Sequence, residues 1–195
     1  MSLLVLLAAA AQAPTQSAYP AREVLEGFAQ VCRPLATLEG AAAAAEKSGW
    51  RKFEPEAASQ IASLIAFGKS EGKKMLAEKG GEMLPTRVFH RTIAGEDLIV
   101  VLSGVKINGV LVNGCRAYDV GETRELPAAQ VEAWLNRKPS KTVVDPAIHI
   151  TSWEPGYDAQ HDSFDLYFIP QGSPAIELLK VSGIGLKADF VGAVK

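Results

Sequence analysis

The chain has 195 residues, of which 48% are hydrophobic and 22% charged, and its formal net charge is −2. A chain of this size can bury one sizeable core, and no long linker of Ser, Gly and Pro divides it. The 20 Lys and Arg residues are interspersed with 22 Asp and Glu residues, which argues against an electrostatic nucleic-acid binder. We therefore expect a single domain over 21–195 and no nucleic-acid partner.

Residues 1–11 are rich in Leu and Ala, which is typical of a secretory signal peptide. Cleavage is predicted after Ala11, or alternatively after Ala13. The run is too short to span a bilayer, and no later stretch is long and apolar enough to do so. No Lys or Arg precedes it, which leaves open whether the start codon is correct. The sequence thus predicts a periplasmic or secreted protein without an integral membrane span, with a flexible leader over 12–20.

Helical spacing of apolar residues dominates the N-terminal part that follows. It predicts a first helix over 22–33, which Pro34 should end because proline disfavours helical geometry at the preceding residue. A second helix is expected over 41–47, with Thr37 as its N-cap and Gly49 as a left-handed C-cap.

The next segment is less regular. A third helix is predicted over 57–67, but 68–84 is richer in Gly and Lys and less periodic. We expect this second stretch to be a mobile loop, with a short helix over 73–79 as the alternative, because its glycines raise the entropic cost of ordering.

Strand signals begin after Thr86. Runs over 88–93, 98–107 and 110–118 indicate β-strands, and Asn108-Gly109 between the last two predicts a tight hairpin. Gly114 is a candidate for a β-bulge that would redirect the following cysteine.

The C-terminal half continues this pattern. A helix is predicted from Pro127 to about Arg137, and strands over 147–153 and 164–168, with shorter apolar runs beyond them. Helices first and hairpin-connected strands afterwards favour an α+β fold. We expect N-terminal helices packed on one face of an antiparallel sheet of five or six strands.

The chain has two cysteines, Cys32 and Cys115. In an oxidising compartment two such thiols tend to form a disulfide, here between the first helix and a central strand. Redox-active pairs are normally close in sequence, so this disulfide is predicted to be structural. Two cysteines and three scattered histidines offer no spacing for a zinc site, and no metal or cofactor is expected.

Three short features together form a wider pattern: Cys32 on a first helix, Gly49-Trp50 closing the second, and the strand Asn113-Gly114-Cys115-Arg116-Ala117-Tyr118-Asp119. This pattern resembles a group of small exported bacterial proteins of uncharacterised function, over most of the chain after the signal. The resemblance implies export and the same Cys32–Cys115 pairing. It implies no catalytic residue.

Two motifs near residue 70 are discounted. Gly68-Lys69-Ser70 lacks the first Gly of a phosphate-binding loop, because Ser63 stands at that position, and a helix rather than a strand is expected before it. Ser70-Glu71-Gly72-Lys73 matches the nucleophile motif of penicillin-recognising enzymes, but its companion motifs are missing, since Lys141-Thr142-Val143 lacks the required Gly.

The remaining candidate site is a polar cluster around His161, with Asp158, Asp162 and nearby Asp165. Carboxylates around an imidazole could bind a cation or hold the histidine as a general acid or base. The alternative is a solvated hairpin loop, as short polar loops mostly are.

Because the constellations that an enzyme needs are weak or absent, the sequence favours a non-enzymatic binding or interaction protein of the envelope or periplasm. Its expected partner is an envelope protein or a glycan. One alternative is a small hydrolase or metal-dependent enzyme that uses His161, Asp158 and Asp162. The other is a structural envelope protein without a ligand.

Overall fold

The computed structural model describes residues 17–193, which form five helices and one antiparallel sheet of nine strands. The predicted signal peptide lies outside these residues, as does most of the predicted leader. The helices are α1 (Ala21–Cys32), α2 (Leu38–Lys47), α3 (Gln60–Lys79), α4 (Ala128–Leu135) and α5 (Ala175–Leu179). The strands are β1 (Arg51–Lys52), β2 (Glu82–Met83), β3 (Arg87–Ile93), β4 (Glu96–Ile107), β5 (Val110–Val120), β6 (Lys141–Asp145), β7 (Ile148–Trp153), β8 (Ser163–Ile169) and β9 (Gly183–Ala193).

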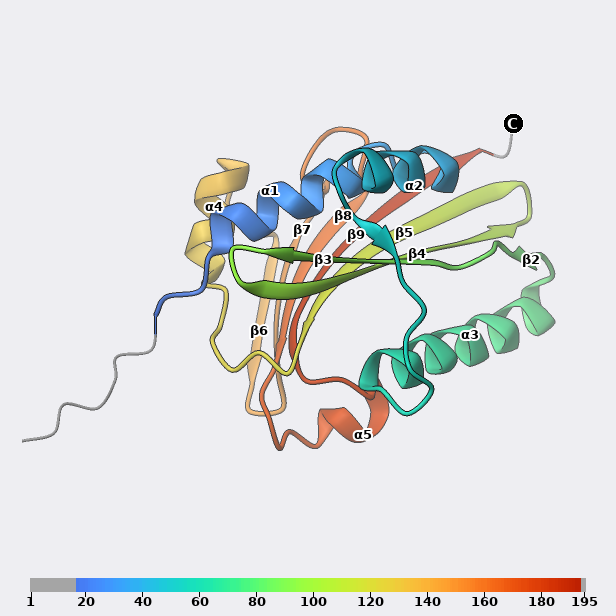
Figure 1. Ribbon diagram of the computed structural model, residues 1–195. Helices are drawn as coiled ribbons and strands as arrows, with labels where there is room; N and C mark the ends of the chain where they lie inside the picture. Colours follow the sequence, from blue (N-terminus) through green and yellow to red (C-terminus); the bar gives the residue numbers. More distant parts are fainter. Residues whose placement is uncertain (1–16, 194–195) are drawn as a thin grey trace, which may run out of the picture.

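The predicted α+β class with an antiparallel sheet is confirmed, but the sheet is larger than predicted and helices cover both of its faces (Figure 1). Its strand order is β1-β3-β4-β5-β9-β8-β7-β6, and β2 pairs with β4. The sequence indicates only a short apolar run near the end of β9, whereas the strand runs along the whole of β5 and also pairs with β8. The three glycines of β9 obscure the alternating pattern that predicts a strand. The strand forms nevertheless, because its backbone N–H and C=O groups find hydrogen-bond partners on both edges.

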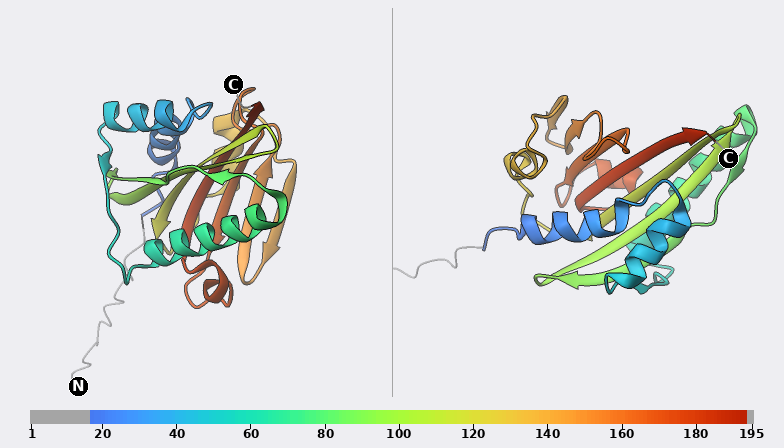
Figure 2. Two further views of the ribbon diagram at one scale, coloured as in Figure 1. Left: turned by 90° about the vertical axis from the view of Figure 1, so that its right-hand side faces the viewer. Right: turned by 90° about the horizontal axis from the view of Figure 1, so that it is seen from above.

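Two layers of helices enclose the sheet, and they differ in how closely they pack. Helices α1, α2 and α4 lie on one face, and α3 and α5 lie on the other (Figures 1 and 2). The continuous hydrophobic core lies between α1, α2, α4 and the sheet. Its largest fully buried side chains include Phe28, Phe89, Trp153, Phe164 and Leu186. We call this side of the sheet the core face and the opposite side the α3 face.

Local signals placed the first two helices and the central hairpin correctly. Helix α1 ends at Cys32, just before the Pro34 stop, and the Thr37 hydroxyl caps α2 by accepting a hydrogen bond from the Gly40 amide at 3.0 Å. Gly49 has the predicted left-handed conformation, with φ 85°. Asn108 and Gly109 also both have positive φ, as a tight turn between β4 and β5 requires.

The prediction of a mobile loop over 68–84 is wrong for most of that stretch, because α3 continues to Lys79. The Ser59 side chain caps its start by accepting from the Ala62 amide at 3.2 Å, and Gly80 ends it with φ 73°. Good helix formers over 73–79 outweigh the two glycines inside the helix. The helix is also long, and each added residue contributes a backbone hydrogen bond.

The β-bulge predicted at Gly114 is also absent from the described strands. Register is continuous through this residue, which pairs with Ser103 of β4 and with Asp189 of β9. A Cβ atom at Gly114 would lie 2.3 Å from Nη1 of Arg116. The Arg116 side chain lies across Gly114, so a larger residue at this position would displace the guanidinium.

The chain before α1 is anchored at Tyr19, which sequence analysis placed in a flexible leader. Tyr19 is buried, and its hydroxyl donates a hydrogen bond to Oδ2 of Asp119 at 2.9 Å. Arg124 lies over the tyrosine ring, donates to Glu96 at 2.7 Å and pairs with Glu122. Burial raises the pKa of Asp119 to about 6, whereas hydrogen bonds from Arg124 lower the pKa of Glu122 to about 2.

The raised pKa of Asp119 predicts a specific pH dependence of stability. The native state keeps a proton on this carboxyl between about pH 4 and 6, where an unfolded chain has lost it, so this contribution to stability falls as pH rises. Urea denaturation should therefore show Asp119→Asn gaining up to about 2 kcal/mol relative to the wild type between pH 4.5 and 7.5. Parallel stability curves for the two proteins would contradict the assignment.

The predicted disulfide between Cys32 and Cys115 is present. It joins the C-terminal end of α1 to the middle of β5, with the two Cα atoms 5.6 Å apart and 83 positions between them in the sequence. Both residues are fully buried in the core. A crosslink that closes so long a loop restricts the unfolded chain strongly.

We therefore expect the double variant Cys32→Ser/Cys115→Ser to lose about 2–5 kcal/mol in the free energy of unfolding. The measurement is urea denaturation of the oxidised wild type, the reduced wild type and the variant. The reduced wild type should behave like the variant. Titration of two free thiols in the denatured, unreduced protein would rule out the crosslink.

Candidate functional site

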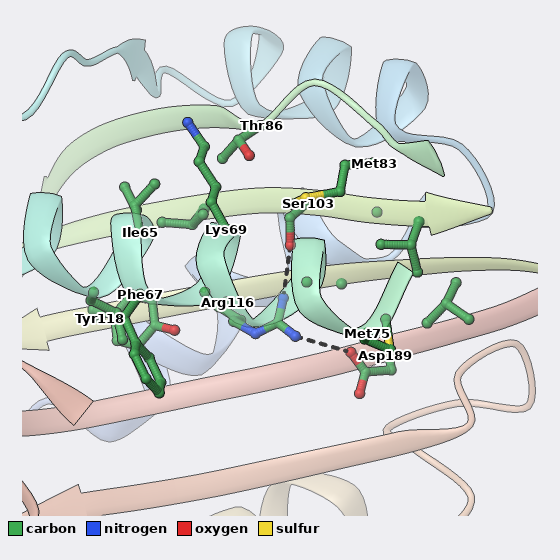
Figure 3. Close-up of a pocket in the computed structure, with 18 residues that line it drawn as sticks. Ile65, Phe67, Lys69, Met75, Met83, Thr86, Ser103, Arg116, Tyr118 and Asp189 are labelled. Atoms are coloured by element: carbon green, nitrogen blue, oxygen red, sulfur yellow. Dashed lines mark hydrogen bonds and ion pairs between the residues drawn. The ribbon is translucent and has the colours of Figure 1, made fainter. Parts of the chain in front are cut away.

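One cavity on the α3 face is a cleft between α3 and strands β4 and β5, with a volume of about 420 Å³ (Figure 3). We call it the α3 cleft. Within the described chain, Ile61 is the one buried residue among the twenty of α3. The side of the helix that faces the sheet carries Leu64, Gly68, Gly72 and Met75, spaced three or four positions apart. A Cβ at Gly68 would meet no atom within 4 Å, so this position leaves space that a larger side chain would fill, whereas the Met83 side chain already lies against Gly72.

The lining of the cleft is mainly apolar. Half-buried side chains of α3 form one wall, and residues of β4, β5 and the segment before β3 form the other. Such a concave, apolar enclosure with a few polar groups is typical of small-molecule sites. Its apolar lining residues are Leu64, Ile65, Phe67, Met75, Met83, Val101, Val105 and Val112.

One arginine lies at the floor of this apolar cleft. Arg116 projects from β5 toward α3, and its side chain is 30% exposed (Figure 3). Within residues 17–193 its guanidinium makes one hydrogen bond, from Nη1 to Oγ of Ser103 at 3.0 Å. Its Nη2 is 3.7 Å from Oδ1 of Asp189, an ion-pair distance that is too long for a hydrogen bond.

The neighbouring charges on the α3 face are paired with one another. The Lys187 ammonium lies 2.6 Å from Asp189 and 3.3 Å from Oδ2 of Asp165, which also accepts a hydrogen bond from the Tyr167 hydroxyl at 3.2 Å. Burial raises the pKa of Tyr167. These groups hold each other in place, so Arg116 is the most weakly engaged charge at the floor of the cleft.

A second cavity, of about 390 Å³, adjoins the α3 cleft. It lies between the start of α3, the end of α5 and the sheet, and we call it the α5 cleft. Its walls include Ile148, Ile150, Ile169 and Leu179. Both clefts share the following lining residues: Leu64, Arg116 and Tyr118. The arginine therefore stands where two apolar spaces meet.

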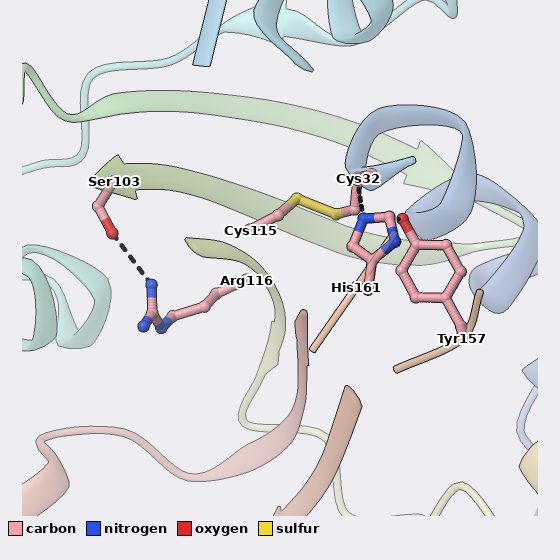
Figure 4. The surroundings of a disulfide bond; sticks show 6 residues. All are labelled: Cys32, Ser103, Cys115, Arg116, Tyr157 and His161. Atoms are coloured by element: carbon pink, nitrogen blue, oxygen red, sulfur yellow. Dashed lines mark hydrogen bonds between the residues drawn. A yellow bond between two sulfur atoms is a disulfide. The ribbon is translucent and has the colours of Figure 1, made fainter. Parts of the chain in front are cut away.

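The sequence-predicted cluster around His161 lies elsewhere, on the core face beside the disulfide (Figure 4). The His161 side chain is 1% exposed, not solvated. Its Nδ1 is 2.6 Å from Oδ1 of Asp158, and its Nε2 is 2.9 Å from both the Tyr157 hydroxyl and the Cys32 carbonyl oxygen. The Tyr157 ring stacks on the imidazole with 4.1 Å between centroids. Nε2 thus links the loop to the end of α1, whereas Nδ1 contacts Asp158 within the loop.

The other predicted site residues are not gathered around this imidazole. Asp162 accepts a hydrogen bond from the Val191 amide at 2.7 Å and so joins the loop to β9. Asp165 lies on the α3 face with Lys187 and Tyr167. The structure brings together Asp158 and His161, and it separates both from Asp165.

The motifs near residue 70 fall on α3. All four of Gly68, Lys69, Ser70 and Lys73 are exposed, and of these Gly68 and Lys69 line the α3 cleft. Arg116 is not among the site residues predicted from the sequence. Strand alternation could have suggested it, because Arg116 follows Cys115 directly and must point to the opposite face of the sheet.

A group of three carboxylates, Glu96, Asp119 and Glu122, is the one arrangement in the described part of the chain that could hold a metal ion. Arg124 already pairs with two of them, and the Tyr19 hydroxyl donates to the third. We therefore interpret this group as the anchor of the segment before α1.

No protein-family model, curated protein or solved structure matches this chain. None of the helices within residues 17–193 is long and apolar enough to cross a membrane. The site is therefore defined by its own geometry: an apolar double cleft with an arginine at the junction, in an α+β protein stabilised by a disulfide.

The buried contacts of His161 predict a large effect of its removal. His161→Ala should lower the free energy of unfolding by about 2–4 kcal/mol, because it leaves a cavity and buried polar groups without partners. The matched control is His149→Ala, whose side chain is 31% exposed and pairs with Glu125; it should cost less than about 1 kcal/mol. Equal effects in urea denaturation would favour the solvated loop expected from the sequence.

Proposed function

We propose that this protein is a non-catalytic, exported binding protein and that its ligand site is the α3 cleft. The observation that carries the proposal is the loose packing of α3, which lies across the sheet with Ile61 as the one buried residue among those described in the helix. A ligand that covers the half-buried apolar side chains on both walls removes their surface from water, which favours binding. The volume of about 420 Å³ lies within the range of roughly 300–1,000 Å³ that is usual for small-molecule pockets.

The disulfide supports the exported location, because such crosslinks persist in oxidising compartments such as the periplasm and the cell exterior. The concave, mainly apolar shape of the cleft favours a small ligand over the envelope protein or glycan expected from the sequence. A purely structural protein would gain stability by filling the cleft with side chains, whereas Gly68 leaves open space where a side chain could stand.

The enzymatic alternative receives less support. His161 is buried, and its ring nitrogens contact Asp158, Tyr157 and the Cys32 carbonyl oxygen. A general acid or base must reach a substrate proton, and a metal ligand needs a nitrogen lone pair directed at the ion. The contacts of this ring support a structural role.

The proposal can be tested with a neutral fluorescent probe, N-phenyl-1-naphthylamine. The wild type should bind it at one or two sites per chain, because the clefts adjoin. Gly68→Leu should weaken binding at least tenfold, since a Cβ at Gly68 meets no atom within 4 Å and the added side chain can occupy the cleft.

The matched control for this experiment is Ala77→Leu, on the exposed side of α3 and nine positions along, half a turn away from Gly68. It adds similar apolar surface to the same helix but should leave probe binding unchanged. Thermal unfolding of each variant checks that it is folded. Absence of probe binding by the wild type, or equal binding by both variants, would refute the α3 cleft as the ligand site.

A further inference from the structure

We infer that the α3 cleft takes a single-chain amphiphile whose anionic head group binds to Arg116, an inference that rests on the proposed function above. The geometry of Arg116 carries it. A charged side chain at the floor of an apolar cleft loses hydration, and that loss must be offset by hydrogen bonds or by an opposite charge. The Ser103 hydroxyl and the Asp189 carboxylate offset part of the hydration that the guanidinium loses.

A guanidinium has five N–H donors. Within the described residues Arg116 uses one of them in a hydrogen bond, to Ser103, and its closest carboxylate is 3.7 Å away. Donors on the planar fork therefore stay available for a carboxylate or phosphate, the groups that bind an arginine through two parallel hydrogen bonds.

The nearby carboxylates do not fully pair with the Arg116 guanidinium. Asp189 is closer to Lys187, at 2.6 Å, than to Arg116. Asp165 accepts hydrogen bonds from Lys187 and from Tyr167. These carboxylates have other cationic or hydroxyl partners, so an incoming anion would meet a cation that is only loosely paired.

The backbone holds the guanidinium where a head group would need it. Because Gly114 has no Cβ, the Arg116 side chain lies against the sheet instead of extending into solvent. From this position the α3 cleft of about 420 Å³ leads to one side and the α5 cleft of about 390 Å³ to the other. An aliphatic tail can enter either space while its head group stays at the arginine.

The test compares four ligands with twelve-carbon tails in displacement of the neutral probe: laurate, dodecyl phosphate, dodecanol and dodecyltrimethylammonium. The wild type should bind laurate or dodecyl phosphate at least tenfold more tightly than the other two. Preference between the two anions then distinguishes a fatty acid from a phosphorylated lipid.

Arg116→Gln should remove the preference for anions, so that laurate and dodecyl phosphate bind no more tightly than dodecanol. Arg116→Lys, which keeps the charge but not the fork, should retain part of the preference and provides a second variant if the first unfolds. The matched control is Arg51→Gln, at an exposed position of β1 that lines neither cleft. It should behave like the wild type.

The outcomes separate the two proposals. If the wild type binds the probe and all four ligands alike, or if Arg116→Gln keeps the preference for anions, the role of Arg116 is refuted while the binding function stands. If the wild type binds neither the probe nor any of the ligands, both proposals fail.

Discussion

The C-terminal end of α1 is fastened to the rest of the molecule through two different parts of Cys32. Its sulfur is bonded to Cys115 in the middle of β5, and its carbonyl oxygen lies 2.9 Å from Nε2 of His161. The first contact seats the helix on the sheet, and the second ties the loop before β8 to the same helix end (Figure 4). Because α1 is held in this way, one face of the sheet becomes a closed core.

The two faces of β5 have different functions: one contributes to the core and the other lines the α3 cleft. Cys115 and Ala117 point into the core, whereas Gly114, Arg116 and Tyr118 point toward α3. Strand alternation makes the division unavoidable, since neighbouring side chains leave a strand on opposite sides. The same five-residue stretch therefore supplies both the disulfide that stabilises the fold and the arginine that we assign to the ligand.

Stability and binding are thereby placed on separate surfaces. The core face has the large buried aromatic residues and the disulfide, so the α3 face can stay loosely packed without unfolding the protein. Clefts that bind ligands commonly occur where local packing is weaker than in the core. Filling such a cleft would be expected to raise stability at the expense of function.

The sequence by itself determined the features that depend on neighbouring residues or on chemistry. The caps at Thr37 and Gly49 and the Asn108-Gly109 turn follow from local backbone preferences, and the pairing of the two cysteines follows from there being only two. Tertiary structure decided what depends on partners distant in the chain. From the sequence, His161 is expected in a solvated loop. In the structure its ring is buried against Cys32, which is 129 positions away in the chain. Likewise, β9 becomes a strand through its neighbours β5 and β8, and Arg116 becomes a candidate site residue only when α3, with glycines on its inner side, leaves space above it.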